Sequence, residues 1–489
     1  MQGTMGQARR GDLLTVDVID LAFGGEGVAR AGGYVVFVPG GVPGDRLDVR
    51  VTQVRPRFAR GQVERIDTPS PLRTEPPCPY FGRCGGCRLQ HMTYEAQLEF
   101  KARQVAECLA RLGGLGPAET ALLAPIIPAP EIYGYRNKME FTFGEAAGQP
   151  VVGLHEAERY DVILDIERCL LQSESMNRVL AEVRAFVREH GVAVYRQESE
   201  DGLLRFLMLR EGRATGEAMV NLVTASPDVP LARALADRLR DRCPQVTSVV
   251  LNVNPKKAAV AIGVEEHPIA GNEVIRERLA GVEFSISANS FFQTNTRQAE
   301  RLFGIVADFA GLTGREVVFD LYSGTGAISL LLAPRARVVY GIELVPAAIE
   351  DATRNARANG ISNCTFLPGE VRHVLPELLR QGIRAEVVVA DPPRAGFHPG
   401  ALKAVLALAP RRVVYVSCNP ATLARDLATL TAGGYRIGAV QPLDMFPHTP
   451  HIEVVARLDR NSEGGSAPLP NLPREDEERG RRPRAERNT

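Results

Sequence analysis

The sequence predicts an α/β protein whose carboxyl-terminal part forms a doubly wound, mostly parallel sheet, preceded by an amino-terminal β-barrel and a central α+β region. Three observations support this fold class. Short strands broken by glycine fill residues 13–66, strands and helices are mixed between 130 and 285, and strands alternate with helix-compatible stretches after residue 289. A chain of 489 residues also exceeds what one hydrophobic core usually serves. We therefore expect domains at 6–67, 68–288 and 289–459, followed by a tail at 460–489.

The composition is typical of a soluble globular protein, with 45% apolar and 24% charged residues. No apolar run is long enough to cross a bilayer, and residues 1–12 show no signal-peptide pattern, so we expect a cytoplasmic monomer without a membrane partner. Lys+Arg and Asp+Glu each number 58. The net charge thus indicates no class of partner, and any nucleic-acid surface has to be local.

The first region predicts a small β-barrel, with strands expected over 14–18, 34–38, 47–54 and 61–66. Its later part is rich in arginine: Arg46, Arg50, Arg55, Arg57, Arg60 and Arg65. Only two acids, Asp48 and Glu64, lie in the same stretch. A small barrel with one basic face is typical of OB-like RNA-binding modules. The alternative is a solvated strand edge, because edge strands often carry charge.

The central region begins with a proline-rich connector over 68–77, a group of cysteines and a helix expected over 94–112. Beyond it the pattern mixes strands and helices. Strands are expected over 138–143, 161–166, 220–223 and 248–253, and helices over 174–189 and 231–242. This part of the sequence contains no internal repeat and is the least informative about function.

The last region alternates strands with helices, which predicts a doubly wound sheet. The expected strands are 317–320, 338–343, 364–367, 387–391, 413–418, 435–440 and 453–458. Ligands of such sheets bind outside the carboxyl ends of the parallel strands. From residue 461 onward the chain is rich in proline, glycine and charge, so we expect this tail to be disordered.

A glycine-containing loop follows the first of these strands, at 320–326. Gly324 and Gly326 allow the backbone to approach a ligand closely; the less favoured alternative is a tight strand–helix turn. Ser329 stands where pyrophosphate binding would favour a third glycine. Glu343 ends the next strand, where a carboxylate can accept both ribose hydroxyls of a nucleoside. The pattern therefore favours S-adenosylmethionine over NAD.

Two further motifs end parallel strands: Asp-Pro-Pro-Arg at 391–394 and Ser-Cys-Asn-Pro at 417–420. An isolated cysteine after an apolar run is more often a buried small hydrophobe. Together with a methyl-donor loop, however, Cys418 suits chemistry on a pyrimidine. A thiolate that adds to carbon 6 makes carbon 5 nucleophilic toward a methyl group. A base then removes the carbon 5 proton so that the thiol can leave.

These motifs resemble the RNA uracil-5-methyltransferase family, whose catalytic domain is a Rossmann-like class I methyltransferase fold. The matching residues are 292–295, 320–326, Glu343, 391–394, 417–420 and 451–453. The resemblance implies that Gln293, Tyr322, Glu343 and Asp391 contact S-adenosylmethionine beside Gly324 and Gly326, that Cys418 is the nucleophile and that Glu453 is the base. The amino-terminal barrel resembles the TRAM domain of the same family. Ala327 departs from the pattern, since some members carry an asparagine there.

The cysteines at Cys78, Cys84 and Cys87 are close in sequence, and Cys169 lies further along the chain. Four thiolates suit structural zinc or an iron–sulfur cluster, and spacing alone leaves both open. The family resemblance implies a [4Fe–4S] cluster with Cys169 as its fourth ligand, in a structural or RNA-positioning role. The remaining cysteines, Cys108, Cys243 and Cys364, sit among apolar residues and are expected to serve packing.

The leading hypothesis is methylation of carbon 5 of a uridine in structured RNA. Family members with both the barrel and the cysteine cluster tend to modify large-subunit ribosomal RNA, so 23S ribosomal RNA is favoured over transfer RNA. A cytosine-5 methyltransferase is an alternative, because it would use the same thiol addition. A non-catalytic RNA-binding or assembly protein with a methyltransferase fold is the third hypothesis.

Overall fold

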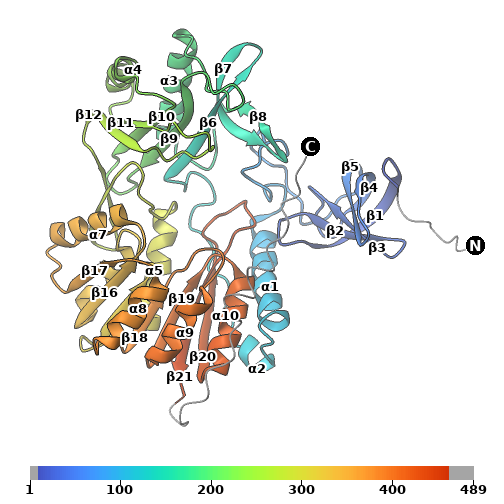
Figure 1. Ribbon diagram of the computed structural model, residues 1–489. Coiled ribbons are helices and arrows are strands. Elements are labelled where there is room, and N and C mark those ends of the chain that lie inside the picture. Colours follow the sequence, from blue (N-terminus) through green and yellow to red (C-terminus); the bar gives the residue numbers. More distant parts are fainter. Residues whose placement is uncertain (1–8, 462–489) are drawn as a thin grey trace, which may run out of the picture. The chain divides into compact units, whose positions relative to one another are not determined.

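The computed structural model describes residues 9–461, which form two compact units (Figure 1). Among the described residues, the first unit comprises residues 9–104, Ile126–Arg301 and Leu443–Ile452, and the second comprises Val105–Pro125, Leu302–Pro442 and residues 453–461. The chain last crosses between the units at the peptide bond that joins Ile452 to Glu453. The tail predicted at 460–489 lies outside the described residues from 462 onward.

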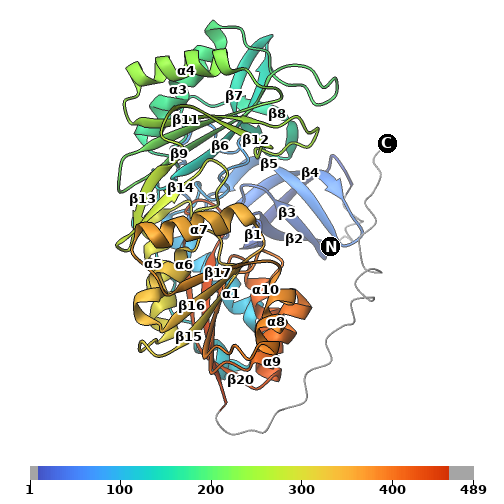
Figure 2. The same cartoon turned by 60° about the vertical axis from the view of Figure 1, so that its left-hand side comes forward.

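The first unit begins with a closed barrel of strand order β1-β2-β3-β5-β4 (Figure 2). Its strands are β1 (Leu13–Leu21), β2 (Gly27–Ala31), β3 (Tyr34–Val38), β4 (Arg46–Val54) and β5 (Phe58–Thr68). Alternate residues point inward and form a core of Val16, Val18, Ala29, Val36, Val38, Leu47 and Val49. The predicted barrel is confirmed. The strand that was not predicted, β2, is short and contains glycine and alanine, which give little strand signal.

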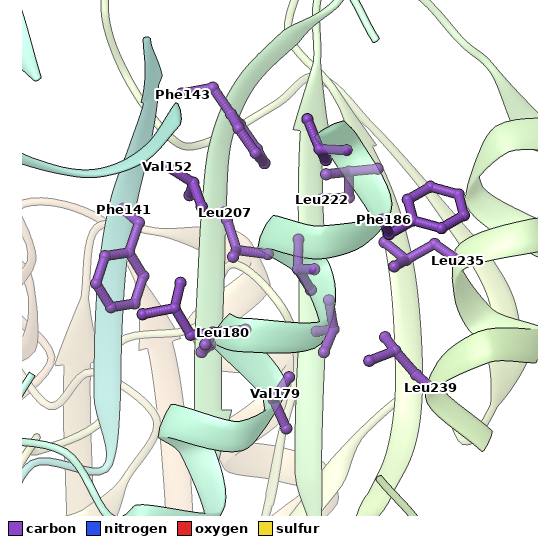
Figure 3. Packing of buried hydrophobic residues seen from close by; sticks show 14 of the residues in the cluster. Phe141, Phe143, Val152, Val179, Leu180, Phe186, Leu207, Leu222, Leu235 and Leu239 are labelled. Carbon is purple, nitrogen blue, oxygen red and sulfur yellow. The ribbon is translucent and has the colours of Figure 1, made fainter. Parts of the chain in front are cut away.

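The centre of the first unit is a seven-stranded sheet of order β12-β11-β10-β9-β6-β7-β8. The strands are β6 (Lys138–Ala146), β7 (Gln149–Glu156), β8 (Arg159–Asp165), β9 (Leu204–Glu211), β10 (Ala218–Thr224), β11 (Val246–Val253) and β12 (Glu265–Gly271). Helices α3 (Glu174–Glu189) and α4 (Val229–Arg242) pack on it, and Val179 and Leu235 of the helices share one apolar core with Leu207 and Leu222 of the strands (Figure 3). A small hairpin, β13 (Ile275–Leu279) and β14 (Val282–Ile286), follows.

Two longer helices each belong partly to both units: α1 (Tyr94–Arg111) and α5 (Thr296–Ala310). The short helix α2 (Pro117–Thr120) lies in the second unit.

The second unit is built on a seven-stranded sheet of order β17-β16-β15-β18-β19-β21-β20. Its strands are β15 (Val317–Leu321), β16 (Val338–Glu343), β17 (Cys364–Pro368), β18 (Val387–Ala390), β19 (Arg412–Ser417), β20 (Tyr435–Leu443) and β21 (Glu453–Arg460). The helical elements between them are α6 (Ala327–Leu332), η1 (Ala333–Arg335), α7 (Pro346–Ala358), α8 (Val371–Arg380), α9 (Pro399–Leu408) and α10 (Pro420–Ala432). Strands β15 to β19 run parallel, and β21 pairs antiparallel with β19. The predicted doubly wound sheet is confirmed.

Candidate active site and cysteine cavity

Four loops of the second unit leave the same edge of its sheet. Because β16, β15, β18 and β19 are parallel neighbours, their carboxyl ends are adjacent. These ends carry Glu343, the loop that starts at Tyr322, Asp391 and Cys418. The topology therefore assembles four of the predicted site segments without any contact from elsewhere in the chain.

The loop after β15 has an unusual backbone. Tyr322, Gly324 and Gly326 all have positive φ angles, of 65°, 52° and 81°. A Cβ atom on Gly326 would lie 3.0 Å from Ala352, so packing alone requires glycine there. A Cβ atom on Gly324 would meet nothing within 4 Å, which leaves open space beside that residue. The tight-turn explanation therefore accounts for Gly326, whereas Gly324 borders room for a ligand.

Glu343 is tied to this loop by its carboxylate. Its Oε2 atom accepts a hydrogen bond from the Gly324 amide at 3.0 Å, and Oε1 accepts one from the Val345 amide at 2.8 Å. Each oxygen retains a lone pair, so the carboxylate is oriented and can still accept hydroxyl groups.

Carboxyl groups give this edge a negative potential. Desolvation, together with the nearby Asp391 and Glu343 carboxylates, raises the pKa of Asp320 to about 7. Desolvation also raises the pKa of Asp391 to about 7. Two buried oxygens, Asp320 Oδ1 and Ser323 Oγ, have no hydrogen-bond partner among the described residues. Unpartnered acceptors beside clustered carboxyls favour a cationic, hydrogen-bonding ligand.

Cys418 and Glu453 lie together at the ends of neighbouring strands. Ser417 of β19 pairs with Val454 of β21, which places the residues next to them, Cys418 and Glu453, at one end of the pair. Cys418 is half-buried rather than enclosed in the core, and Glu453 is only 6% exposed. Cys418 is therefore not a fully buried core residue, and Glu453 is not a carboxylate that faces water.

The two groups also influence each other electrostatically. Desolvation raises the pKa of the Cys418 thiol, the Glu453 carboxyl raises it further, and Arg394 opposes both effects. Desolvation raises the pKa of Glu453 well above its ordinary value, and Asp391 adds to this shift. Glu453 is thus a stronger base than an exposed glutamate, and Arg394 is the cation that favours the charged forms of both groups.

Sequence reasoning assigned no role to the residues that hold the Arg394 loop. The Asn419 side chain caps α10 through the Ala421 amide at 3.1 Å and donates to the Arg394 carbonyl at 3.1 Å. Asp426, which is 1% exposed, accepts hydrogen bonds from the Phe397 amide and the Tyr415 hydroxyl. A lone acid on the apolar face of α10 was the signal that could have identified Asp426.

Gln293, predicted to contact the cofactor, belongs to the first unit. It lies between β14 and α5, where its carbonyl accepts a hydrogen bond from Asn137 Nδ2 at 2.9 Å. The same Asn137 amide group donates to Thr296 Oγ1, whose hydroxyl donates to the buried Glu277 carboxylate. Gln293 is therefore on a well-anchored segment, separate in the chain from the four loops of the second unit.

The four cysteines predicted as metal ligands line a single cavity of about 130 Å³ in the first unit, together with Tyr80, Gln90 and Arg136. Main-chain turns gather them: the Phe81 amide donates to the Cys78 carbonyl and the Cys84 amide to the Tyr80 carbonyl. Cys169 is held by Asn177, which accepts from its amide and donates to its carbonyl. Cys169, although distant in sequence, thus lines the same cavity as the other three cysteines.

Three thiols in this cavity, those of Cys84, Cys87 and Cys169, are desolvated. Burial raises the pKa of Cys84 to about 11 and that of Cys87 to about 12, and the neighbouring thiols contribute to both shifts. In the described residues no group of three or more His, Cys, Asp or Glu side chains is spaced to hold one metal ion. All four donors are thiols, which suit soft metals such as zinc as well as iron–sulfur clusters.

The other three cysteines are located as follows. Cys243 is buried in the core of the central sheet. Cys108 and Cys364 are half-buried, and the Cys364 thiol lies 3.7 Å from the Ser329 carbonyl.

Most of the arginines that were predicted to form a basic face on the barrel are paired with acids. The basic face is therefore smaller than predicted. Four of the six form ion pairs, and several partners come from outside the stretch considered from sequence: Arg46 with Asp17 and Asp67, Arg50 with Glu64, Arg60 with Glu26, and Arg65 with Asp48 and Asp67. Arg55 and Arg57 are exposed at the turn between β4 and β5, without an acidic partner among the described residues.

Across residues 9–461, no helix is long and apolar enough to cross a membrane.

Comparisons with known proteins agree with this geometry. A family model described as tRNA (Uracil-5-)-methyltransferase matches residues 232–461, and a TRAM domain model matches 7–63. An uncharacterized RNA methyltransferase of Halalkalibacterium halodurans is 44% identical over 450 residues, covering 92% of this chain and 97% of that protein. One from Chlorobaculum tepidum is 40% identical over 472 residues, covering 92% and 97%.

A solved structure also matches nearly the whole chain. The Pyrococcus abyssi tRNA (uracil-54, C5)-methyltransferase in complex with S-adenosyl-L-homocysteine has a TM-score of 0.73 and 33% identity, covering 91% of this chain and 99% of that one. The sheet of the second unit is accordingly a class I methyltransferase fold, and the barrel is a TRAM domain. With these relatives and this arrangement of strands, the chain belongs to the RNA uracil-5-methyltransferase family of S-adenosylmethionine-dependent enzymes.

Proposed function

We propose that this enzyme methylates carbon 5 of a specific uridine in RNA through a covalent adduct on Cys418. The observation that carries the proposal is the pairing of Ser417 with Val454, which sets a half-buried thiol beside a buried carboxyl at the end of two adjacent strands. A nucleophile and a base within one small site are what addition and elimination on a pyrimidine require.

The chemistry divides between the two residues. The Cys418 thiolate adds to carbon 6 of uracil, and the electron pair of the carbon 5–carbon 6 double bond moves toward the carbonyl at carbon 4. S-adenosylmethionine, when bound, supplies the methyl group that carbon 5 takes up. Glu453 then accepts the proton from carbon 5, the double bond re-forms, and the sulfur of Cys418 leaves as a thiolate.

The residues proposed to hold the cofactor are Gln293, Tyr322, Gly324, Gly326, Glu343 and Asp391. Glu343 has both oxygens oriented by backbone amides, which suits the two ribose hydroxyls. The carboxyl cluster of Asp320, Glu343 and Asp391 favours the positive sulfonium. Residues 289–459 would form the methyltransferase domain, with 68–288 and the TRAM barrel at 6–67 serving RNA recognition.

For the cysteine cavity we propose a [4Fe–4S] cluster held by Cys78, Cys84, Cys87 and Cys169. Four thiols that line one cavity of about 130 Å³ supply the four thiolates that such a cluster takes, with a single zinc ion as the lesser alternative. The cluster would supply charge compensation and a fixed fold for the segment that carries three of its ligands.

The RNA target we propose is 23S ribosomal RNA. Transfer RNA is the second candidate, and a specific observation favours it: the Pyrococcus abyssi enzyme that matches along 91% of this chain is named for a tRNA uridine. Mapping of 5-methyluridine in both RNAs, from cells with and without this protein, decides between them.

The proposed reaction is tested by incubating the protein with labelled methyl donor and RNA that contains 5-fluorouridine. The fluorine cannot leave as a proton does, so a uridine enzyme accumulates a covalent protein–RNA complex that carries label. A cytosine-5 methyltransferase would label cytosine in ordinary RNA and leave the fluorouridine RNA unbound. RNA binding without label or adduct would instead favour a non-catalytic binding protein.

A further inference from the structure

The segment Leu443–Ile452, which we call the strap, joins β20 to β21 and ends one residue before Glu453. Connections between strands usually run over the surface. The strap instead is buried in the first unit: Asp444 and Met445 are fully buried, and His448 and Thr449 are 3% and 4% exposed. Its burial means that the chain leading to the proposed base is held by surrounding side chains.

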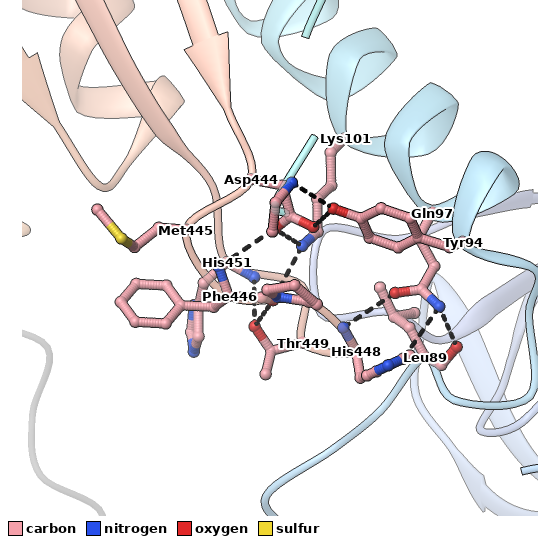
Figure 4. Close-up of polar contacts among 12 residues, drawn as sticks. Leu89, Tyr94, Gln97, Lys101, Asp444, Met445, Phe446, His448, Thr449 and His451 are labelled. Carbon is pink, nitrogen blue, oxygen red and sulfur yellow. Dashed lines mark hydrogen bonds and ion pairs between the residues drawn. The ribbon is translucent and has the colours of Figure 1, made fainter. Parts of the chain in front are cut away.

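One end of the strap is fixed by helix α1 (Figure 4). Lys101 Nζ donates to Asp444 Oδ1 at 2.6 Å and to the Phe446 carbonyl at 3.1 Å, and neither Lys101 nor Asp444 is exposed. The Tyr94 hydroxyl donates to the other oxygen of Asp444 at 3.0 Å. A fully buried ion pair adds little net stability, because desolvation offsets the attraction, but separating its partners leaves an uncompensated buried charge and is strongly destabilising.

The other end is fixed by the segment that follows Cys87. The amides of Arg88 and Leu89 both donate to the His448 carbonyl, at 2.9 and 3.0 Å. Gln97 connects the same two segments: its Nε2 donates to the Leu89 carbonyl at 3.0 Å, and its Oε1 accepts from the His448 amide at 2.9 Å. Gln97 is itself fully buried. The backbone next to a proposed cluster ligand is thus bonded directly to the strap.

The strap contains a strained residue at this contact. His448 has a φ of +66°, a conformation that costs energy for a residue other than glycine. It persists because Gln97 and the Leu89 segment hold the backbone and because Tyr133 stacks on the ring, with centroids 4.3 Å apart. If those contacts were lost, the strap would relax to an ordinary backbone conformation and its path toward Glu453 would change.

We propose that the strap positions Glu453 and that Gln97 is the positioning residue that couples the cysteine segment to the base. The inference rests on the proposed function, in which Glu453 acts only after methyl transfer. Strand pairing fixes the chain after Glu453 through Val454, and the strap fixes the chain before it through Ile452, which is 1% exposed. Disturbing the strap therefore slows proton removal and leaves addition by Cys418 intact.

The coupling gives the cysteine cavity a role in the second half of the reaction. Loss of the group held by Cys78, Cys84, Cys87 and Cys169 would loosen the backbone at Arg88 and Leu89. The His448 carbonyl would lose both of its donors, and the strap would relax as it does when Gln97 is changed. An enzyme with an empty cavity would then methylate its RNA once and release it slowly.

The test uses the full-length Gln97→Met variant, which conserves volume and removes all of the side chain's hydrogen bonds. With ordinary uridine RNA and labelled methyl donor, we expect the first methyl transfer at close to the wild-type rate. Turnover should fall by on the order of a hundredfold, the effect of a small misplacement of a catalytic group. A labelled covalent protein–RNA band should accumulate on a denaturing gel. Hydrogen exchange of the His448 amide should also become faster than in the wild type.

Two further variants keep the test decisive. Tyr94→Phe removes one hydrogen bond to Asp444 and should give the same band more weakly. Arg73→Met is the matched control, because it breaks another ion pair with a fully buried acid, Asp45, outside the strap. It should lower the melting temperature without producing a band. A band of equal strength in Arg73→Met would overturn the proposal, because general destabilisation would then explain the result.

The remaining outcomes are distinct. Wild-type turnover and no band in Gln97→Met would overturn the role of the strap. A Cys87→Ser protein that turns over without a band, beside a Gln97→Met protein that shows one, would overturn the coupling to the cysteine cavity. A wild-type protein that forms no adduct with 5-fluorouridine RNA would instead contradict the proposed function itself.

Discussion

The two seven-stranded sheets of this molecule bring reactive side chains together in different ways. In the second unit, parallel strands β15, β16, β18 and β19 end at one edge, and each adds a residue of the candidate active site. In the seven-stranded sheet of the first unit, six strand pairs include only one parallel pair, β10 with β11. Here the cysteine cavity is built from turns and from residues within β6 and β7, not from a row of strand ends.

The contrast separates what topology determines from what individual contacts determine. The many hydrogen bonds between parallel strands hold the strand ends together, so the active-site edge does not depend on one particular hydrogen bond. The cysteine segment instead docks through single bonds, such as that from the Gly85 amide to the His155 carbonyl at 3.1 Å. We expect changes at the first site to affect chemistry, and changes at the second to affect local order.

The largest effect is expected at Cys418. Cys418→Ala removes the only proposed nucleophile, so methyl transfer should fall below detection while S-adenosylmethionine binding stays unchanged. The matched control is Cys364→Ala, a half-buried cysteine of the same sheet whose thiol pKa is raised to about 12 by burial. This control should retain activity. Loss of activity in both variants, with normal folding of each, would mean that the sheet and not the thiol is responsible.

The corresponding change in the first unit is Cys84→Ser. Removing one of four thiolates should bleach the broad iron–sulfur absorbance of anaerobically purified protein and leave cofactor binding intact. Cys243→Ser, in the apolar core of the same unit, should keep the absorbance. Stoichiometric zinc without iron in the wild-type protein would contradict the cluster assignment.

The carboxyls of the active-site edge predict a particular pH dependence. Folding raises the pKa of Asp320 and Asp391 from 3.8 to about 7, so the folded state binds more protons than the unfolded state between these values. Their contribution to stability is complete at low pH and is lost as pH rises through about 7. The melting temperature of cofactor-free protein should therefore fall between about pH 4 and about pH 7, and Asp391→Asn should reduce the fall. A melting temperature that rises over this range would contradict the shifts.

The smallest effect is expected in the barrel. Arg55→Gln with Arg57→Gln should weaken RNA binding and lower the slope of log affinity against log salt by about two, close to one unit per phosphate contact. Arg50→Gln with Arg65→Gln is the control, since those side chains already pair with Glu64 and Asp48. An equal change of slope in both double variants would mean that the barrel acts through its total charge alone.

Much of the fold could be predicted because its elements are locally consistent. Every strand of the second unit was expected, since apolar runs there alternate with helices at regular spacing. In the first unit β9 was missed because all eight of its residues are buried, which removes the alternation that identifies a strand. Strand β7 was missed because Gly153 and Pro150 weaken its pattern.

The candidate site could be predicted only where its reactive residues lie at the ends of regular strands. Cys418 and Asp391 stand at strand ends, so their neighbourhood followed from topology. The burial of Glu453 did not, because a strand-initial carboxylate more often faces water. The pairing of Arg60 with Glu26 could not be predicted either, since it joins β5 to the turn between β1 and β2 and depends on how the barrel closes.

The central claim is that Cys418 acts as the nucleophile and Glu453 as the base, and one denaturing gel tests it. Glu453→Gln keeps the size of the side chain and removes the base, an effect of about a hundredfold or more on turnover. With ordinary uridine RNA we predict a labelled, methylated protein–RNA band in this variant, and no such band in the Cys418→Ala, Glu453→Gln double variant. Normal turnover of Glu453→Gln, without a shifted band, would contradict the account.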